Sequence, residues 1–546
     1  MASEVQDRGW RASPFLRWFL PVAIFAVILR VVFAYYVIIP DRLLDDGYIT
    51  LRYAGNLTEG RGFVYNQGQP VWGTTTPLFT LLLYLSASVF GVSALEHSAL
   101  VIDIVASVIF WLCLWRIFEE QRVPRLASIP VFFVVMFSPA FFSNSLSGME
   151  TPVVLLLMAL SLYAYTKDKA LLLGVLFALL LMARIDTLIW IGILGGGFIL
   201  RHYRTNPRSI LVGVLTFVVL SLPWQIYAYV TFHSLIPQSL VGKAVSHGAF
   251  ESVGRDYFVK YYQIYYPFGR LRSFDRAGVW AGIAAIWTGI AITLSLMLWG
   301  FWTVWRMTPL LRPLAVFFFC FSGAFYLAKA PEFAWYFPPA QWVAYFLLCM
   351  GLYGAWNTGL ASARSHAVRL LPWGALVAFL TLQSGVGLRD FWRDRAQPNL
   401  FVALSQYITA NSDKDSTIFV EHIGTVGFRS GRTIIDNMGL VSPEIADLKR
   451  KDPDGWLVDS LKTLKPDVVV LYTTQVPNYT PEDWAKDDPV WYERARSNIQ
   501  VHPLPVPTWN KEDLAWFERE YRFEKRFETF PRTYVYFKVG PGKPQS

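Results

Sequence analysis

Long apolar runs, separated by short loops that carry Lys and Arg, make up most of the chain before residue 390. A helix needs about 20 apolar residues to cross a bilayer core, and by that measure the pattern predicts about eleven membrane-spanning helices. A shorter run at 77–90 predicts either an interfacial helix or one further span. The predicted spans lie near residues 15–39, 97–118, 126–144, 151–166, 169–186, 187–203, 209–231, 279–306, 311–329, 337–357 and 369–388.

The pattern changes at about residue 390, where the chain becomes polar and is interrupted by Pro. A segment with helical spacing, NLFVALSQYITAN, is followed by the β-rich runs STIFVEHIGTVGF, RTIIDN, PDVVVLY and RTYVYFKV. Such a mixture predicts helices and strands packed together. We therefore expect a transmembrane module at 1–389, with a first long loop at about 40–96, and a small soluble α/β domain at 390–546.

The composition agrees with a polytopic membrane protein. Of the 546 residues, 54% are hydrophobic and only 16% are charged, which excludes an ordinary soluble enzyme. The formal net charge of +9 falls in short loops between apolar runs, so it indicates topology and not a nucleic-acid partner. The three Cys residues lie inside apolar runs and predict neither a disulfide framework nor a Cys-based metal site.

The basic residues of the loops predict the orientation of the helices, because cytoplasmic loops carry an excess of Lys and Arg. With a cytoplasmic N-terminus, the loop at about 40–96 and everything after residue 389 lie on the extracytoplasmic side. The cytoplasmic segments then contain Arg8, Arg11, Arg17, Arg116, Arg122, Arg125, Lys167, Lys169, Arg201, Arg204, Arg208, Arg306, Arg312, Arg364 and Arg369.

Two adjacent carboxylates, Asp45 and Asp46, open the first long loop in DDGYITLRYAGNLTEG. The acidic start and Gly60 predict a helix at the membrane surface. One Asp is enough to cap such a helix, so the second indicates chemistry. A carboxylate at this boundary can accept the proton of an attacking hydroxyl, such as that of a sugar. Its partner can tune the first carboxylate, hydrogen-bond the acceptor or help to hold Mg²⁺ or Mn²⁺.

The same loop and several later segments resemble the GT-C superfamily of membrane glycosyltransferases. The chain reads DDGYITLRYAGNLTEGRGFVYNQGQPVWGTTTPLFTLL from residue 45. The branch that contains the mycobacterial terminal arabinofuranosyltransferase typically shows DDAYITYRYARNLxxGxGxVxNxGExVEGYTxPLxTLL. Further similar segments are SGMETP at 147–152, ARIDTL at 183–188, IPQSLVGK at 236–243, FAWYFPPAQW at 333–342 and IGTVGFRSGRTIIDNMGLVSPE at 423–444.

The resemblance implies an inverting glycosyltransferase of the bacterial inner (plasma) membrane. Such an enzyme moves a sugar from a polyprenyl-phosphate donor to a hydroxyl of an envelope glycan or glycolipid. By analogy, Asp45 is the general base and Asp46 its partner, with the reverse assignment left open. Candidate ligands of the donor phosphate are Arg52, Lys243 and Arg184, and candidate substrate contacts are Tyr53, Glu150, Asp186, Tyr336 and His422.

Several positions depart from the typical pattern near the expected sugar site. Gly47 replaces an Ala, Gly55 replaces an Arg, and the segment PVWGTTT lacks a usual Glu. The sugar therefore stays open. Structural alternatives also stay open: a helix cap for Glu150, an Arg184–Asp186 ion pair, snorkelling of Lys243 to lipid headgroups and a purely structural His422.

Functions of other classes remain as alternatives. A transporter or flippase for a lipid-linked sugar also uses charges at helix ends, but transport sites usually lie near the bilayer midplane between repeats. A non-catalytic scaffold would not need the Asp pair. Among enzymes, a protein O-mannosyltransferase or a lipid A aminoarabinose transferase shares the acidic first loop.

Overall fold

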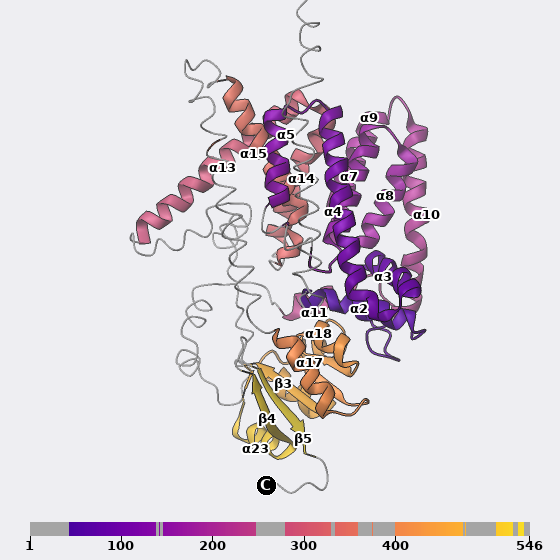
Figure 1. Cartoon of the computed structure of the whole chain (residues 1–546), viewed down its shortest axis with the longest axis vertical. Helices are drawn as coiled ribbons and strands as arrows, with labels where there is room; N and C mark the ends of the chain where they lie inside the picture. The colour runs from indigo at the N-terminus through magenta and orange to yellow at the C-terminus, as the bar shows by residue number, and fades with distance from the viewer. Residues whose placement is uncertain are drawn as a thin grey trace, which may run out of the picture.

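The computed structural model describes residues 43–137, 141, 146–246, 279–328, 333–358, 374, 399–472, 475–476, 509–527 and 533–539. Figure 1 shows two parts along the long axis: a bundle of helices from residues 43–358, and a C-terminal unit from residues 399–539. The predicted spans at 15–39 and 369–388 lie outside the described residues, apart from residue 374.

The bundle consists mainly of apolar helices, several of which begin with Pro. Pro77, Pro152 and Pro207 stand in first turns, where a helix loses no internal hydrogen bond to Pro. The helices are α2 (Asp45–Thr58), α3 (Pro77–Phe90), α4 (Leu95–Glu120), α5 (Arg125–Phe137), α7 (Thr151–Thr166), α8 (Ala170–Ala183), α9 (Leu188–His202), α10 (Pro207–Phe232), α11 (Gln238–Ser246), α13 (Val279–Met307), α14 (Arg312–Leu327) and α15 (Pro338–Thr358), with short 3₁₀ turns η3 (Ile185–Thr187) and η6 (Ala334–Tyr336).

The chain is a multi-pass membrane protein. In the described part of the chain, five helical segments are long and apolar enough to cross a membrane. Helix α10 buries only 11% of its most apolar window, so most of that apolar surface faces outward, as lipid contact requires. The five segments are Val92–Glu120, Ile185–His202, Pro207–Phe232, Ile290–Met307 and Pro309–Leu327.

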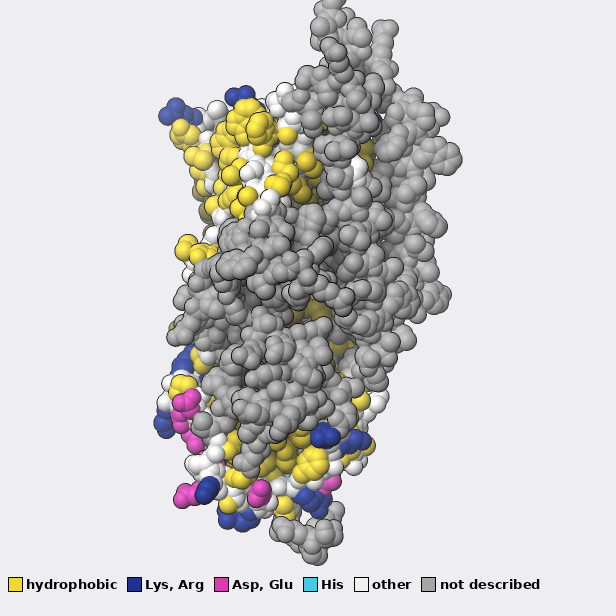
Figure 2. Space-filling view, turned by 90° about the vertical axis from the view of Figure 1, so that its left-hand side faces the viewer, with side chains coloured by type: hydrophobic (Ala, Val, Ile, Leu, Met, Phe, Trp, Pro, Cys, Tyr) yellow, Lys and Arg dark blue, Asp and Glu magenta, His cyan; other side chains and the backbone are white. Residues whose placement is uncertain are grey.

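Each predicted span overlaps a helix where the structure describes it, and the number of crossings stays a prediction. The span predicted at 126–144 is helical at 126–137, and residues 138–140 and 142–145 lie outside the described residues. The run at 77–90 forms the 14-residue helix α3, shorter than a bilayer core requires. The turns between α4 and α5, and between α9 and α10, lie at the end of the bundle farthest from the C-terminal unit (Figure 1). Lys and Arg side chains are visible at that end (Figure 2).

The C-terminal unit is a mixed sheet with helices packed on it. Its strands β1 (Thr417–Val420), β2 (Thr433–Asp436), β3 (Val468–Tyr472), β4 (Tyr521–Phe527) and β5 (Thr533–Lys538) are ordered β2-β1-β3-β5-β4. Strand β1 pairs in parallel with β2 and β3, and β5 pairs antiparallel with β3 and β4. The helices are α17 (Leu400–Asn411), α18 (Ile423–Ser430), α19 (Pro443–Lys451), α20 (Trp456–Leu464) and α23 (Lys511–Glu520).

One expectation for this unit is wrong. The run STIFVEHIGTVGF predicts β structure, but only Thr417–Val420 is a strand, and α18 begins at Ile423. The two Gly residues of α18, which lower its helix propensity, lie against the bundle where a side chain would not fit. Tertiary packing therefore outweighs local preference here.

Helix α2 lies across the end of the bundle and is covered by α18 of the C-terminal unit (Figure 1). A single cluster of buried apolar side chains runs through both parts. It includes Ile49 and Tyr53 of α2, Trp224 of α10, Val426 of α18 and Val470 of β3. This shared core holds α2 between membrane helices on one side and the sheet unit on the other.

Candidate active site

The adjacent carboxylates Asp45 and Asp46 occupy the first turn of α2, as predicted, but have different surroundings. Successive residues of a helix are turned by about 100°, so the two side chains leave the axis on different faces. The carboxylate of Asp45 meets α18: its Oδ2 accepts a hydrogen bond from the Gly424 N–H at 3.0 Å, and its Oδ1 accepts one from the Thr425 N–H at 2.8 Å. Asp45 thus caps a helix of the C-terminal unit and not its own.

Burial and neighbours act in opposite directions on Asp45. Burial raises the pKa of its carboxyl group above the ordinary value, while the nearby His422 and the N–H of Thr425 lower it, with burial the larger effect. Both oxygens are already hydrogen-bonded, which limits their use toward a substrate.

Asp46 faces the bundle. Its Oδ2 lies 3.5 Å from Lys243 Nζ of α11, and its side chain is 29% exposed. The Lys243 ammonium also lies over the rings of Phe333 at 4.8 Å, Trp335 at 5.8 Å and Tyr336 at 5.9 Å. Burial lowers the pKa of Lys243, but Tyr336 and Asp46 outweigh that effect and raise it.

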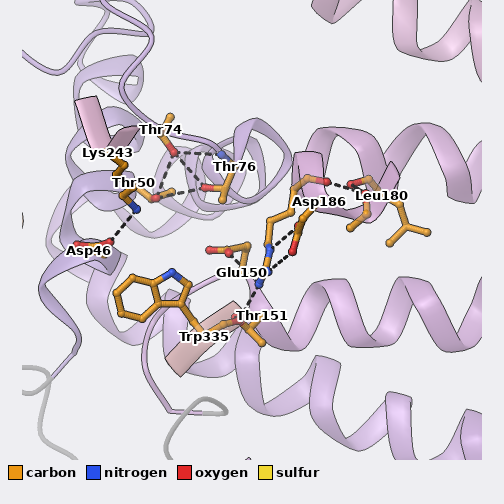
Figure 3. A network of polar contacts seen from close by, with 12 residues as sticks. Asp46, Thr50, Thr74, Thr76, Glu150, Thr151, Leu180, Asp186, Lys243 and Trp335 are labelled. Atoms are coloured by element: carbon orange, nitrogen blue, oxygen red, sulfur yellow. Dashed lines mark hydrogen bonds and ion pairs between the residues drawn. The ribbon is translucent and has the colours of Figure 1, made fainter. Parts of the chain in front are cut away.

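A second charged group lies close to this pair (Figure 3). Arg184 forms two hydrogen bonds with Asp186, at 3.0 Å from Nε and 2.5 Å from Nη2, and its Nη1 lies 3.7 Å from Glu150 Oε1. Arg184 also donates to the Trp335 carbonyl at 2.8 Å and stacks over the Tyr336 ring at 4.9 Å. Trp335 and Tyr336 of η6 thereby connect Arg184 to Lys243.

Three buried hydroxyl groups complete the surroundings. Thr50 lies one helical turn after Asp46 on the same face of α2. Its Oγ1 is 3.4 Å from that of Thr74 and 3.3 Å from that of Thr76, which are 3.0 Å from each other (Figure 3). We call Asp46, Lys243, Glu150, Arg184, Asp186 and these three threonines the polar cluster.

The structure therefore brings together five of the predicted site residues and the Tyr336 ring at one end of the bundle. The structural alternative for Arg184 and Asp186 is also realised, because they form a local ion pair. The interaction of Lys243 with Asp46 and three aromatic rings differs from simple snorkelling. Their chemical roles stay a prediction.

Arg52 and Tyr53 make structural contacts outside the polar cluster, and their roles toward donor and substrate stay predictions. The Arg52 guanidinium is buried and donates to the carbonyls of Tyr65 and Arg432 at 2.8 and 2.7 Å, so it joins the first loop to the C-terminal unit. Tyr53 is fully buried, donates to the Val71 carbonyl at 2.6 Å and accepts from the Gly73 N–H at 2.8 Å. The loop at 63–73 folds over α2 and engages both side chains.

His422 lies beside Asp45 but outside the polar cluster. Its Nδ1 is 2.7 Å from the Tyr472 hydroxyl, and its ring stacks on Phe401 at 4.2 Å. These contacts belong to the packing of the C-terminal unit, which agrees with the structural alternative.

Sequence reasoning missed Asp103. This residue of α4 is fully buried, and its Oδ2 accepts a hydrogen bond from the Gly148 N–H at 3.0 Å, which fixes the turn that leads to Glu150. The Ser147 carbonyl of that turn accepts from the Leu44 N–H at 3.0 Å, at the start of α2. A lone acidic residue inside a predicted span was the available signal.

In the described residues, no three His, Cys, Asp or Glu side chains gather as a metal site.

The loop after β2 was also missed. Burial raises the pKa of Asp436 to about 6, although its carboxylate accepts hydrogen bonds from the N–H groups of Met438, Leu440 and Val441 and lies near Lys449, which all lower the pKa. Burial lowers the pKa of Lys449 to about 8, although the negative charges of Asp436 and Glu421 raise it. The buried carboxylate thus holds residues 437–441 in a fixed turn.

This arrangement predicts a pH-dependent stability. The pKa of Asp436 in the folded protein, about 6, exceeds the ordinary 3.8. Protonation of Asp436 therefore stabilises the folded state. This stabilisation is complete below pH 3.8 and is lost as the pH rises through 6. The shift corresponds to about 3 kcal/mol. Thermal unfolding of the wild type and Asp436→Asn between pH 8 and 5 measures the first part of this change: the wild type is expected to gain stability relative to the variant on acidification. A difference that does not change with pH contradicts the prediction.

Two solved structures share this architecture. The chain superposes on ArnT from Cupriavidus metallidurans bound to undecaprenyl phosphate with a TM-score of 0.53 and 12% identity, over 98% of this chain and 100% of that one. The apo state of the same protein gives a TM-score of 0.51 and 13% identity, over 97% and 99%. This chain has the GT-C fold.

Sequence similarity to a curated protein covers a smaller part of this GT-C chain. Over 124 residues, 22% of the chain, it is 34% identical to the terminal beta-(1->2)-arabinofuranosyltransferase of Mycobacterium tuberculosis. The match spans 20% of that relative's length. Residues 389–536 match a family described as a domain of unknown function, DUF8728.

Proposed function

We propose that this protein is an inverting glycosyltransferase that moves a sugar from a polyprenyl-phosphate donor to a hydroxyl of an envelope glycan or glycolipid. The observation that carries the proposal is the pairing of Asp46 with Lys243 at 3.5 Å, beside the Arg184 cluster. This pairing supports a role for Asp46 as base and for Lys243 as cation, in a fold shared with an ArnT structure bound to undecaprenyl phosphate. The partial similarity to an arabinofuranosyltransferase supports the reaction class.

In the proposed reaction, Asp46 accepts the proton of the acceptor hydroxyl. The oxygen of that hydroxyl forms a bond to the anomeric carbon, while the bond from this carbon to the phosphate oxygen breaks on the opposite side. Polyprenyl phosphate leaves with the electron pair, and the configuration of the anomeric carbon inverts. Lys243 stabilises the negative charge that develops on the leaving phosphate.

In this proposal Asp46 is the general base, whereas the family resemblance favours Asp45 in that role. A general base must reach the proton that it abstracts. The Asp45 oxygens are held by α18, whereas Asp46 is partly exposed and forms an ion pair with Lys243. Asp45 becomes the partner that orients the first turn of α2.

Arg184 is a weaker candidate for the phosphate than Lys243. Its charge is compensated by Asp186 and Glu150, and its side chain is only 2% exposed. We assign it to hold η6, whose aromatic residues surround Lys243. Tyr336, Glu150 and the threonines of the polar cluster are then the candidate contacts of the donor sugar.

We place the polar cluster on the extracytoplasmic face of a bacterial inner membrane, with the N-terminus in the cytoplasm. The basic turns at the opposite end of the bundle support this orientation. The proposed boundary between a membrane module at 1–389 and an extracytoplasmic domain at 390–546 agrees with the change from long apolar helices to a sheet.

A transfer assay tests the function. Purified protein in detergent is given a panel of radiolabelled polyprenyl-phosphate sugars with an envelope-glycan extract. We expect label to move from one donor to the glycan fraction, and the product linkage to have the configuration opposite to that of the donor. Binding of a lipid-linked sugar without transfer from any donor would contradict the proposal and favour a transporter.

A further inference from the structure

The C-terminal unit contacts the residue immediately before each of the two charged groups that face each other in the polar cluster. Asp45, which precedes Asp46, accepts hydrogen bonds from Gly424 and Thr425 of α18. Gly242, which precedes Lys243, lies against Gly439 of the loop after β2. Two separate segments of one unit therefore hold the two halves of the pair.

The first contact, between α18 and α2, is close enough to require Gly. A Cβ at Gly424 would lie far inside contact distance of the Asp45 carbonyl oxygen, and one at Gly427 would clash with the Tyr65 hydroxyl. That hydroxyl donates to the Ile423 carbonyl at 2.7 Å. Farther along α18, Arg429 donates to Glu96 of α4 at 2.6 Å. The helix therefore has little freedom to shift over α2.

The second contact, between the loop after β2 and α11, has the same character. A Cβ at Gly242 would lie 2.6 Å from the Gly439 carbonyl oxygen. That carbonyl accepts a hydrogen bond from Gln238 Nε2 at 3.1 Å, and the Met438 carbonyl accepts one from Ser246 Oγ at 2.8 Å. Three positions along α11 are thus fixed by two neighbouring residues of the loop.

The loop itself is rigid, because Asp436 binds three of its N–H groups and Gly439 has a φ of 78°. Lys449 of α19 adds a hydrogen bond to Ser246 Oγ at 2.8 Å, at the end of α11. Both contacts therefore lead back to one sheet: α18 connects β1 to β2, and the loop begins where β2 ends.

We propose that the C-terminal unit is a positioning clamp, which fixes the distance between the Asp46 carboxylate and the Lys243 ammonium. Gly424, Thr425, Gly242 and Gly439 act as positioning residues, and none of them needs to touch substrate. The inference rests on the proposed glycosyl transfer and assigns a role to the region that matches a domain of unknown function. Catalytic geometry is sensitive to such spacing, since a displacement of about 1 Å can lower a rate about 10²-fold.

Double-mutant cycles test the clamp in the active enzyme. We expect Gly424→Ala and Gly242→Ala each to lower kcat about 10²-fold with a small change in the KM for the donor. In an Asp46→Asn background, Gly424→Ala is expected to lower the residual rate far less, because the group that it positions is already lost. The same holds for Gly242→Ala in a Lys243→Met background. Equal factors in the wild-type and the substituted backgrounds would mean a general loss of folded protein and would overturn the proposal.

Two substitutions serve as matched controls. Gly431 ends α18 with a φ of 65° and meets nothing within 4 Å, so Gly431→Asn keeps the helix and the left-handed conformation. Gly196 of α9 also meets nothing within 4 Å, so Gly196→Ala adds a methyl group in open space. Both controls are expected to retain wild-type kcat.

A second measurement does not depend on activity. Asp46→Cys and Lys243→Cys are combined in protein whose three native Cys residues are Ser, and a short bis-thiol reagent links them. We expect the yield of cross-link to fall several-fold on addition of Gly424→Ala or Gly242→Ala, and to stay unchanged with Gly431→Asn. An unchanged yield in all variants overturns the clamp. If the transfer assay fails but the cross-link yields change as expected, the proposed function is wrong and the clamp is supported.

Discussion

Asp46→Asn is expected to lower kcat for sugar transfer about 10²–10⁴-fold, with little change in the KM for the donor. Asn has nearly the shape of Asp and can still accept a hydrogen bond from Lys243, but it cannot take the acceptor's proton. The loss therefore falls on the chemical step. Steady-state rates with the donor found in the transfer assay, measured over a range of donor concentrations, separate the two constants.

Asp45→Asn is the matched control for this experiment. In this variant, one of the two side-chain oxygens is replaced by an NH₂ group, which is a donor. This donor would face the N–H groups of Gly424 and Thr425 and could not accept a hydrogen bond from them. We expect a loss of stability and a smaller loss of kcat, since the base itself remains. If folded Asp45→Asn loses more kcat than folded Asp46→Asn, the base is Asp45 and our assignment is wrong.

Lys243→Met is expected to lower kcat about 10²–10³-fold, as does removal of a group that stabilises developing charge in other active sites. Met keeps the length and much of the apolar contact of Lys, so the packing against Phe333 and Tyr336 persists without the cation. The Asp46 carboxylate also loses its partner at 3.5 Å. The measurement compares transfer from the preferred donor with binding of polyprenyl phosphate alone.

Two further variants make the result interpretable. Lys243→Arg keeps a charge at the site but changes its geometry, so we expect it to restore part of the lost rate. Lys462→Met removes an exposed charge that pairs with Asp513 in the C-terminal unit, and should leave transfer unchanged. Equal rates for Lys243→Met and the wild type would exclude Lys243 from the phosphate site.

Part of the candidate site could be predicted from the sequence, because it depends only on residues that are close together in the chain. The acidic start of α2 and the apolar runs follow from residue type and spacing, and the structure has helices at those places. The polar residues Glu150, Arg184 and Lys243 follow or precede such runs, so they were expected at helix ends. Their convergence with Asp46 follows from helices that run alternately up and down the bundle.

The different surroundings of Asp45 and Asp46 depend on contacts that no local pattern encodes. The pair reads as one motif, yet α18 binds only Asp45, and the sequence of α18 lies in a run that predicts β structure. The spacing of residues along α2 does not reveal that the loop at 63–73 and Arg432 provide the acceptors of Arg52. The glycines of α18 and α11 gave no signal alone, since the reason for each lies in a segment far away in the chain.

The contact between Asp45 and Gly424 spans 379 residues of sequence, which has a consequence for how the protein is made. Ribosomes add about 5–20 residues per second, so Gly424 emerges roughly 20–80 s after Asp45. Until the segments around Gly424 and Gly439 have been synthesised, α2 and α11 lack the support that both receive from the C-terminal unit. A nascent protein would then be inert toward lipid-linked sugars during its insertion, and would become active only when the C-terminal unit folds onto it.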